Sequence, residues 1–152
     1  MKSKICCFAG HSEIYDFSIA EKTEKLVIKL IEQGVCEFWV GNYGGFDRLA
    51  SSIVRKLKNN YSHIKLNLII PYLTKEITEN KLEFSAKYDC ILIADIPENT
   101  PKKFYIIKTN EYMINNSDYL ICYVSHSWGG AYKTYEYAKR KSHIQIFNIG
   151  NI

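Results

Sequence analysis

The chain has 152 residues, 47% of them hydrophobic, and we expect residues 1–152 to form one globular domain with a core of its own. The formal net charge of +4 favours anionic ligands, but lysine and arginine are spread along the chain, which disfavours nucleic acid as a partner. No run of the sequence approaches the ~20 apolar residues of a membrane span, so we expect no membrane association.

Apolar runs alternate with amphipathic stretches along the chain. Runs that are apolar on both faces, as buried parallel strands are, predict strands over residues 5–9, 37–40, 66–71, 91–96, 120–124 and 144–148. Helical spacing predicts helices over 19–30, 46–57, 102–115 and 130–141, the first stopping at Gly34. The polar stretch 74–87 allows one short helix, and two prolines predict a loop over 97–101.

This alternation predicts an α/β fold. Right-handed crossovers give a Rossmann-like, doubly wound, mostly parallel sheet of about six strands with helices on both faces. Ligands of such sheets bind beyond the carboxyl ends of the strands, where the strand order reverses. Residues 10–12, 41–47 and 125–130 each end a strand with glycine or polar side chains, so we expect them to meet on one rim.

The most informative segment is the glycine pair Gly129 and Gly130, which follows an apolar strand and opens a helix. Free N–H groups of a first helical turn bind anions, and glycine lets a phosphate approach the backbone. We interpret the pair as a phosphate site, although it could simply make a tight turn. Candidate contacts to the ligand come from the flanking residues Trp128, Ala131, Tyr132, Lys133, Thr134 and Glu136.

Two of these residues also have a plain structural interpretation. Lys133 could neutralise phosphate or be an ordinary solvated lysine. Glu136 could hold a ribose hydroxyl or stabilise an oxocarbenium-like centre, but it also lies four residues before Arg140, where an exposed ion pair contributes little.

A second candidate segment follows the second predicted strand. Gly41, Gly44 and Gly45 repeat the phosphate-cradle pattern, and Asp47 is either a ligand contact or a cap of the helix. The pattern is neither Gly-x-Gly-x-x-Gly nor a Gly-x-x-x-x-Gly-Lys-Ser/Thr loop, so it supports neither an ordinary NAD site nor an NTPase.

Histidines and cysteines complete the candidate chemistry. Gly10 and His11 close the first strand, and His11 could contact phosphate, act as acid or base, or be structural. The other histidines show no metal spacing, and only His126 lies near the glycine pair. An odd count of 5 cysteines without Cys-x-x-Cys disfavours disulfides and zinc and indicates buried free thiols in a reducing cytoplasm. The apolar part of the N-terminus is too short for a signal sequence, and we expect no metal or cofactor.

Several of these motifs together resemble one family. They are Phe-Ala-Gly-His ending at His11, Gly-Asn-Tyr-Gly-Gly-Phe-Asp ending at Asp47, Asn110-x-x-Met with Asp118, and Gly129-Gly130-Ala-x-Lys-Thr. This set resembles the SLOG superfamily and, within it, the small YspA-like branch of Rossmann-like proteins.

The resemblance implies a nucleotide-related ligand with Asn110 among its contacts. The superfamily includes LOG phosphoribohydrolases, whose signature is Pro-Gly-Gly-x-Gly-Thr-x-x-Glu. Here Gly129, Gly130 and Glu136 keep their places, whereas Trp128 replaces the proline and Tyr132-Lys133 replaces Gly-Thr. A fainter resemblance to nucleoside deoxyribosyltransferases implies the same ligand class.

We therefore expect a cytoplasmic protein that binds a nucleotide or a nucleotide-derived molecule. The alternative is a hydrolase of an N-glycosidic bond, with Glu136 as the catalytic carboxylate and His11 or Asp47 assisting. Relatives of this fold often pair through their helices, which leaves a homodimer or a higher homo-oligomer open.

Overall fold

The computed structural model describes residues 3–152; Met1 and Lys2, from the basic start of the chain, lie outside the described residues. Its centre is a sheet in the order β4-β3-β2-β1-β5-β6, and every neighbouring pair is parallel. The predicted fold class is confirmed. The strands are β1 (Lys4–Gly10), β2 (Val35–Val40), β3 (Lys65–Ile70), β4 (Cys90–Ile93), β5 (Tyr119–Tyr123) and β6 (Gln145–Asn148).

Three strands end earlier than predicted: β5 ends at Tyr123 instead of residue 124, and Pro71 accounts for the ends of β3 and β4. β3 stops at Ile70 because Pro71 has no N–H to donate to a ladder. The N–H of Ala94 still donates to the carbonyl of Ile70 at 2.7 Å, but beyond it β4 has no strand beside it. The predicted strand 91–96 therefore ends at Ile93.

The helices occupy the predicted segments, with one difference. Residues 74–87 form two short helices rather than one, and the Thr74 hydroxyl caps the first by accepting the N–H of Ile77 at 3.3 Å. The helices are α1 (Ser18–Glu32), α2 (Gly45–Leu57), α3 (Lys75–Glu79), α4 (Lys81–Lys87), α5 (Tyr105–Asn116), preceded by the 3₁₀ turn η1 (Lys102–Phe104), and α6 (Gly129–Lys139).

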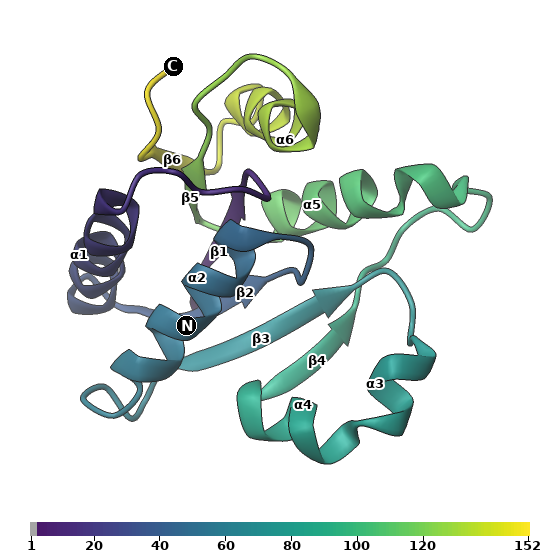
Figure 1. Cartoon of the computed structure of the whole chain (residues 1–152), viewed down its shortest axis with the longest axis horizontal. Helices are drawn as coiled ribbons and strands as arrows, with labels where there is room; N and C mark the ends of the chain where they lie inside the picture. The colour runs from purple at the N-terminus through teal and green to yellow at the C-terminus, as the bar shows by residue number, and fades with distance from the viewer. Residues whose placement is uncertain (1–2) are drawn as a thin grey trace.

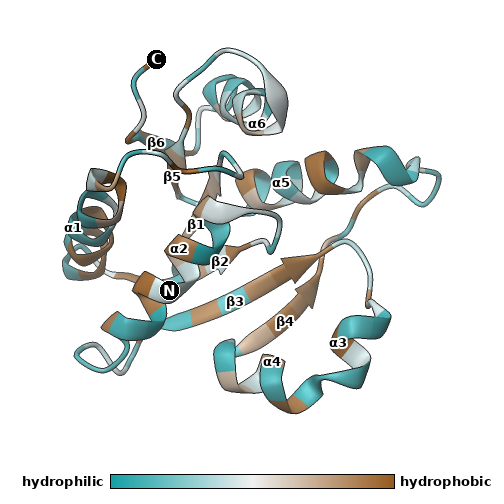
Figure 2. Cartoon of the chain, in the orientation of Figure 1, coloured by the Kyte–Doolittle hydropathy of each residue, from teal (hydrophilic) through white to brown (hydrophobic). Residues whose placement is uncertain are grey.

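The helices cover the two faces of the sheet in two groups. α1 and α2 pack together on one face, and α5 and α6 pack together on the other (Figure 1). Alternate strand residues feed the two cores, so Phe8 and Phe38 pack on the α1–α2 side, while Cys7 and Trp39 pack on the other. Figure 2 shows β3 and β4 as mostly hydrophobic strands; β3 is buried except at Lys65, whereas the edge strand β4 is half-buried to exposed.

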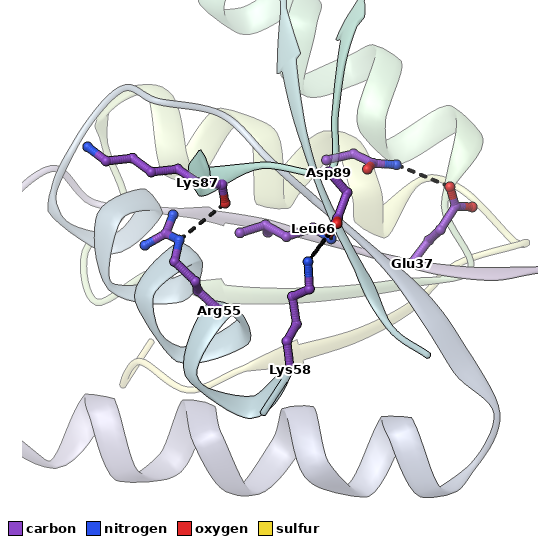
Figure 3. Close-up of polar contacts among 7 residues, drawn as sticks. Glu37, Arg55, Lys58, Leu66, Lys87 and Asp89 are labelled. Carbon is purple, nitrogen blue, oxygen red and sulfur yellow. Dashed lines mark hydrogen bonds and ion pairs between the residues drawn. The ribbon is translucent and has the colours of Figure 1, made fainter. Parts of the chain in front are cut away.

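Polar contacts tie the elements together at the amino ends of β3 and β4 (Figure 3). Asp89 accepts hydrogen bonds from Lys58, just beyond α2, and from the N–H of Leu66 at 2.8 Å. The Arg55 guanidinium donates to the carbonyl of Lys87 at 3.1 Å. Polar groups of the loops at this end of the sheet therefore bond to other groups of the protein.

No helix in residues 3–152 has the length and apolar character to cross a membrane. The cysteines are unpaired: Cys6, Cys7 and Cys122 are buried as expected, and Cys36 is half-buried. Cys90 differs from the expectation of buried thiols. It is exposed because it lies on β4, at the edge of the sheet.

Candidate functional site

The topology opens a crevice between β1 and β5. Helices follow the two strands on opposite faces, α1 after β1 and α6 after β5, so the chain diverges at their carboxyl ends. Gly10 pairs with Tyr123 in register, and the N–H of His11 donates to the carbonyl of Tyr123 at 3.1 Å. The loops that follow both strands therefore start at the same level of the rim (Figure 1).

A cavity of about 420 Å³ lies at this rim. Eight residues singled out in the sequence line it, and they come from β1, α2, α5 and the start of α6. They are Gly10, His11, Asp47, Asn110, Trp128, Gly129, Gly130 and Ala131. The structure thus brings the segments 10–12 and 125–130 together, along with Tyr43 and Asp47 from the segment 41–47.

The first turn of α6 offers unoccupied backbone donors to the cavity. Gly129 has a φ of 90°, a conformation that only glycine adopts readily, whereas a Cβ on Gly130 would meet nothing within 4 Å. Within residues 3–152, the N–H groups of Gly129, Gly130 and Ala131 find no acceptor. This is the geometry in which helix N-termini bind anions.

A stack of three rings forms one wall of the cavity. The ring centroids of His11 and His126 are 3.8 Å apart, and those of His126 and Trp128 are 3.6 Å apart, with interplanar angles of 13° and 20°. The indole of Trp128 is 68% exposed, so an aromatic ligand can extend the stack. Nδ1 of His126 is buried and has no partner among the described residues.

His11 has a defined protonation state. Its Nε2 accepts the N–H of Ser125 at 2.8 Å, so the neutral ring carries its proton on Nδ1. Burial, together with the neighbouring His126, holds the pKa of His11 below its ordinary value, which agrees with the neutral form.

Asp47 is the buried carboxylate of the site. Its Oδ2 accepts the N–H of Tyr43 at 3.0 Å, and no hydrogen bond to Oδ1 is found within residues 3–152. Burial raises the pKa of Asp47 to about 6, even though the N–H of Tyr43 and the charge of Arg48 act to lower it. Gly41 lies directly beneath, where a Cβ would stand 3.2 Å from Oδ2. Asp47 therefore has one oxygen held and one available to a ligand.

Asn110 and Thr134 join α5 to α6 beside the cavity. The Asn110 amide donates to the Thr134 hydroxyl at 3.1 Å, and that hydroxyl donates to the carbonyl of Gly130 at 3.0 Å. Thr134 is buried and does not line the cavity. Its placement makes it a support for Gly130 and Asn110.

The Gly44–Gly45 turn is occupied by the protein itself. A Cβ on Gly44 would stand 2.6 Å from the Cα of Ser12, and one on Gly45 would stand 2.5 Å from the carbonyl oxygen of Ser12. The N–H of Gly45 donates to that carbonyl at 2.7 Å, and the N–H of Phe46 donates to the carbonyl of His11 at 3.3 Å. In this structure the two glycines let α2 pack against the loop after β1, and they do not line the cavity.

Three predicted contacts on α6 also lie outside the cavity lining. Lys133 lines a separate shallow pocket with Thr134 and Arg140. Glu136 pairs with Lys139 at 3.1 Å rather than with Arg140. Burial is the larger cause of the raised pKa of the neighbouring Tyr132 phenol, and the charge of Glu136 adds to it. Tyr132 packs against the core, the Glu136 side chain is 41% exposed, and neither lines the cavity.

The structure adds lining residues that the sequence had not named as ligand contacts. Ser12, Tyr43, Ser125 and His126 belong to the three predicted rim segments, whereas Glu13, Tyr15, Ile106 and Tyr123 do not. The position of Ser12 and Ser125 directly after strands was the available signal. The carboxylate of Glu13 accepts a hydrogen bond from the Tyr15 hydroxyl, and no residue among the described lining is a lysine or arginine.

A family model identifies the chain. The model of the YspA SLOG family matches residues 4–151. The chain belongs to the YspA SLOG family. This confirms the resemblance seen in its motifs.

Individual relatives agree with this assignment. UPF0398 protein BH1768 of Halalkalibacterium halodurans is 27% identical over 137 residues, which cover 86% of this chain and 72% of that protein. Among solved structures, DNA processing protein A from Helicobacter pylori, described for its single-stranded DNA binding mode, matches with a TM-score of 0.65 at 17% identity. The match covers 95% of this chain and 64% of that one, and it shows a shared fold.

Proposed function

We propose that this YspA SLOG protein binds a nucleotide or a nucleotide-derived molecule in the cavity between β1 and β5, in a binding or sensing role. The main support for the proposal is that three kinds of group line the same cavity. They are the N–H groups of Gly129, Gly130 and Ala131, the exposed indole of Trp128 and the carboxylate of Asp47. An anion site, a flat ring and a hydroxyl acceptor are the elements that phosphate, base and ribose require.

The phosphate would bind at the first turn of α6. Donors on this turn are backbone N–H groups, and the helix dipole adds a partial positive charge. The hydroxyls of Ser12 and Ser125 lie in the same lining and can donate further hydrogen bonds. Because no lysine or arginine is in the described lining, oriented dipoles rather than full charges would hold the anion.

The base and the ribose would lie over the remaining walls. The indole of Trp128 presents a stacking surface beside the His126 ring. The free Oδ1 of Asp47 and the amide of Asn110 are placed to bond ribose hydroxyls. Since ribose hydroxyls donate better to an ionised carboxylate, binding should release the Asp47 proton when the pH is below about 6.

The arrangement favours binding over N-glycosidic hydrolysis. The glutamate that would carry catalysis by resemblance, Glu136, pairs with Lys139 and is absent from the cavity lining. A carboxylate must lie next to the anomeric carbon to stabilise the oxocarbenium-like transition state. Glu136 does not meet that requirement here.

Calorimetric titration against a panel of ligands tests the proposal. The panel contains the common ribonucleoside monophosphates, their nucleosides, dinucleotides and a short single-stranded DNA, the last because DNA processing protein A shares the fold. We expect a nucleotide to bind and its nucleoside to bind at least ~10-fold more weakly, because the α6 donors would lose their anion. Chromatography of the same mixtures should find no free base. Failure of every nucleotide to bind would refute the proposal, and release of base would make the protein an enzyme.

A further inference from the structure

A second chamber of about 290 Å³ lies beside the cavity, beyond the carboxyl end of β3. Apolar and aromatic side chains dominate its walls, and Tyr72 and Tyr105 meet edge to face with ring centroids 5.5 Å apart. The walls include Ile70, Pro71, Tyr72, Ile77, Phe84 and Tyr105. A chamber of this size and lining suits a planar ring.

The two chambers share part of their lining. Tyr43 and Ile106 line both, so the loop after β2 and the start of α5 form the boundary between them. The polar groups of the second chamber, including Asn42, Thr74 and Lys102, belong to the same rim of the sheet. One molecule that passes over Tyr43 and Ile106 can therefore occupy both.

Charge distinguishes the ligands that fit the first cavity. Asp47 and Glu13 line it, and none of its described lining residues is a lysine or arginine. A terminal phosphate carries close to two negative charges at neutral pH, whereas a phosphate that bridges two groups carries one. Backbone donors facing two carboxylates accommodate the singly charged bridge better than the doubly charged terminus.

We propose that the ligand has two aromatic heterocycles joined through bridging phosphate, with one ring on Trp128 and the second in the chamber lined by Tyr72 and Tyr105. This rests on the proposed function and narrows its ligand class. The bridge would lie at the first turn of α6 and across Tyr43. Tyr43 lines both chambers, so a bridge that joins the two rings passes over it.

The test compares matched ligands on the intact chain. The probes are adenosine monophosphate, diadenosine diphosphate with its 5′–5′ bridge, and the 3′–5′ dinucleotide of adenosine, together with the same set for the other bases. We expect a bridged compound to bind at least ~10-fold more tightly than its monophosphate, since a stacked base contributes on that scale. The two bridged probes separate the 3′–5′ phosphate, which carries one negative charge, from the 5′–5′ diphosphate, whose two phosphates carry one charge each.

Variants assign this gain to the second chamber. Tyr72 is 44% exposed and lines only that chamber, so Tyr72→Ala should leave the fold intact and remove the gain, changing monophosphate affinity less than ~2-fold. Asn42→Trp, which fills the same chamber from an exposed position, should act likewise. Leu82→Ala is the control, because Leu82 is 88% exposed and lines neither chamber.

The outcomes separate this inference from the function on which it rests. Equal affinity for bridged and unbridged probes would contradict the proposal of a two-ring ligand. So would an affinity gain that Tyr72→Ala and Asn42→Trp leave unchanged. Neither result would contradict nucleotide binding. Binding of no nucleotide at all would overturn both.

Discussion

Asp89 lies at the amino ends of the strands, and Asp47 lies at their carboxyl ends. The surroundings of these two aspartates shift their pKa values in opposite directions. Burial acts to raise the pKa of Asp89, but hydrogen bonds from Lys58 and Leu66 and the charges of Lys58 and Lys65 outweigh it and hold that pKa low. Asp47 has a single backbone donor, and burial raises its pKa to about 6.

Backbone groups show a related contrast. At the amino ends, the N–H of Ile5 donates to the carboxylate of Asp118 at 2.9 Å, although Oγ of the neighbouring Ser117 is buried without a partner among residues 3–152. At the carboxyl ends, the first N–H groups of α6 and Nδ1 of His126 have no partner among residues 3–152. Oriented donors that face a cavity without partners are typical of a site that a ligand completes.

Asp47→Asn should give the largest change in stability. The folded pKa of Asp47 lies above its ordinary value of 3.8, so its contribution to stability is fully present below about pH 4 and is lost as the pH rises through about 6. At pH 7.5 the free energy of unfolding of the Asp47→Asn variant should therefore be roughly 2–3 kcal/mol higher than that of the wild type. Urea unfolding at pH 4 and pH 7.5 measures this, and an equal difference at both values would contradict it.

Asp89→Ala should act in the opposite direction and by less. Removal of the carboxylate leaves Lys58 and the N–H of Leu66 without their partner, which should cost about 1–2 kcal/mol at neutral pH. Because the pKa of Asp89 is lowered, this loss should shrink as the pH falls below the ordinary value of 3.8. Nucleotide affinity should stay unchanged; a weakened affinity would show that the two edges are coupled.

Glu136→Gln should produce the smallest effect. Glu136 pairs with Lys139 near the surface and lies next to the Tyr132 phenol, so stability should change by less than ~0.5 kcal/mol. Ligand affinity should change less than ~2-fold, with no base released by either protein, because Glu136 is outside the cavity lining. Base release by the wild type that disappears in the variant would restore the hydrolase alternative.

Sequence patterns were sufficient to predict the sheet, most of the helices and the rim of the sheet on which the candidate segments meet. They were insufficient for the Gly44–Gly45 turn, because the same glycines serve an open phosphate cradle and a close backbone contact. Which of the two occurs depends on where the Ser12 carbonyl packs, and that is a tertiary contact.

The α6 contacts were missed for a related reason. The burial of Thr134 and Ala138 fixes the rotation of α6 about its axis, and this places Lys133 and Glu136 away from the cavity. The spacing of Lys133 and Glu136 from the glycine pair in the sequence does not predict how α6 is rotated about its axis. Tyr43 and His126 fell within the predicted rim segments, but nothing in the sequence gave the direction of their side chains. The second chamber depends on the polar stretch 74–87, whose pattern allowed only one short helix.

Calorimetry of Gly130→Val against the nucleotide that binds the wild type most tightly tests the central claim most directly. A Cβ at Gly130 meets no protein atom within 4 Å, so the variant should fold normally while its side chain fills the space before the α6 donors. We predict a loss of affinity of ~100-fold or more, beside an unchanged Lys133→Ala control. Unchanged affinity in a folded Gly130→Val protein would contradict the proposal that the first turn of α6 binds the phosphate.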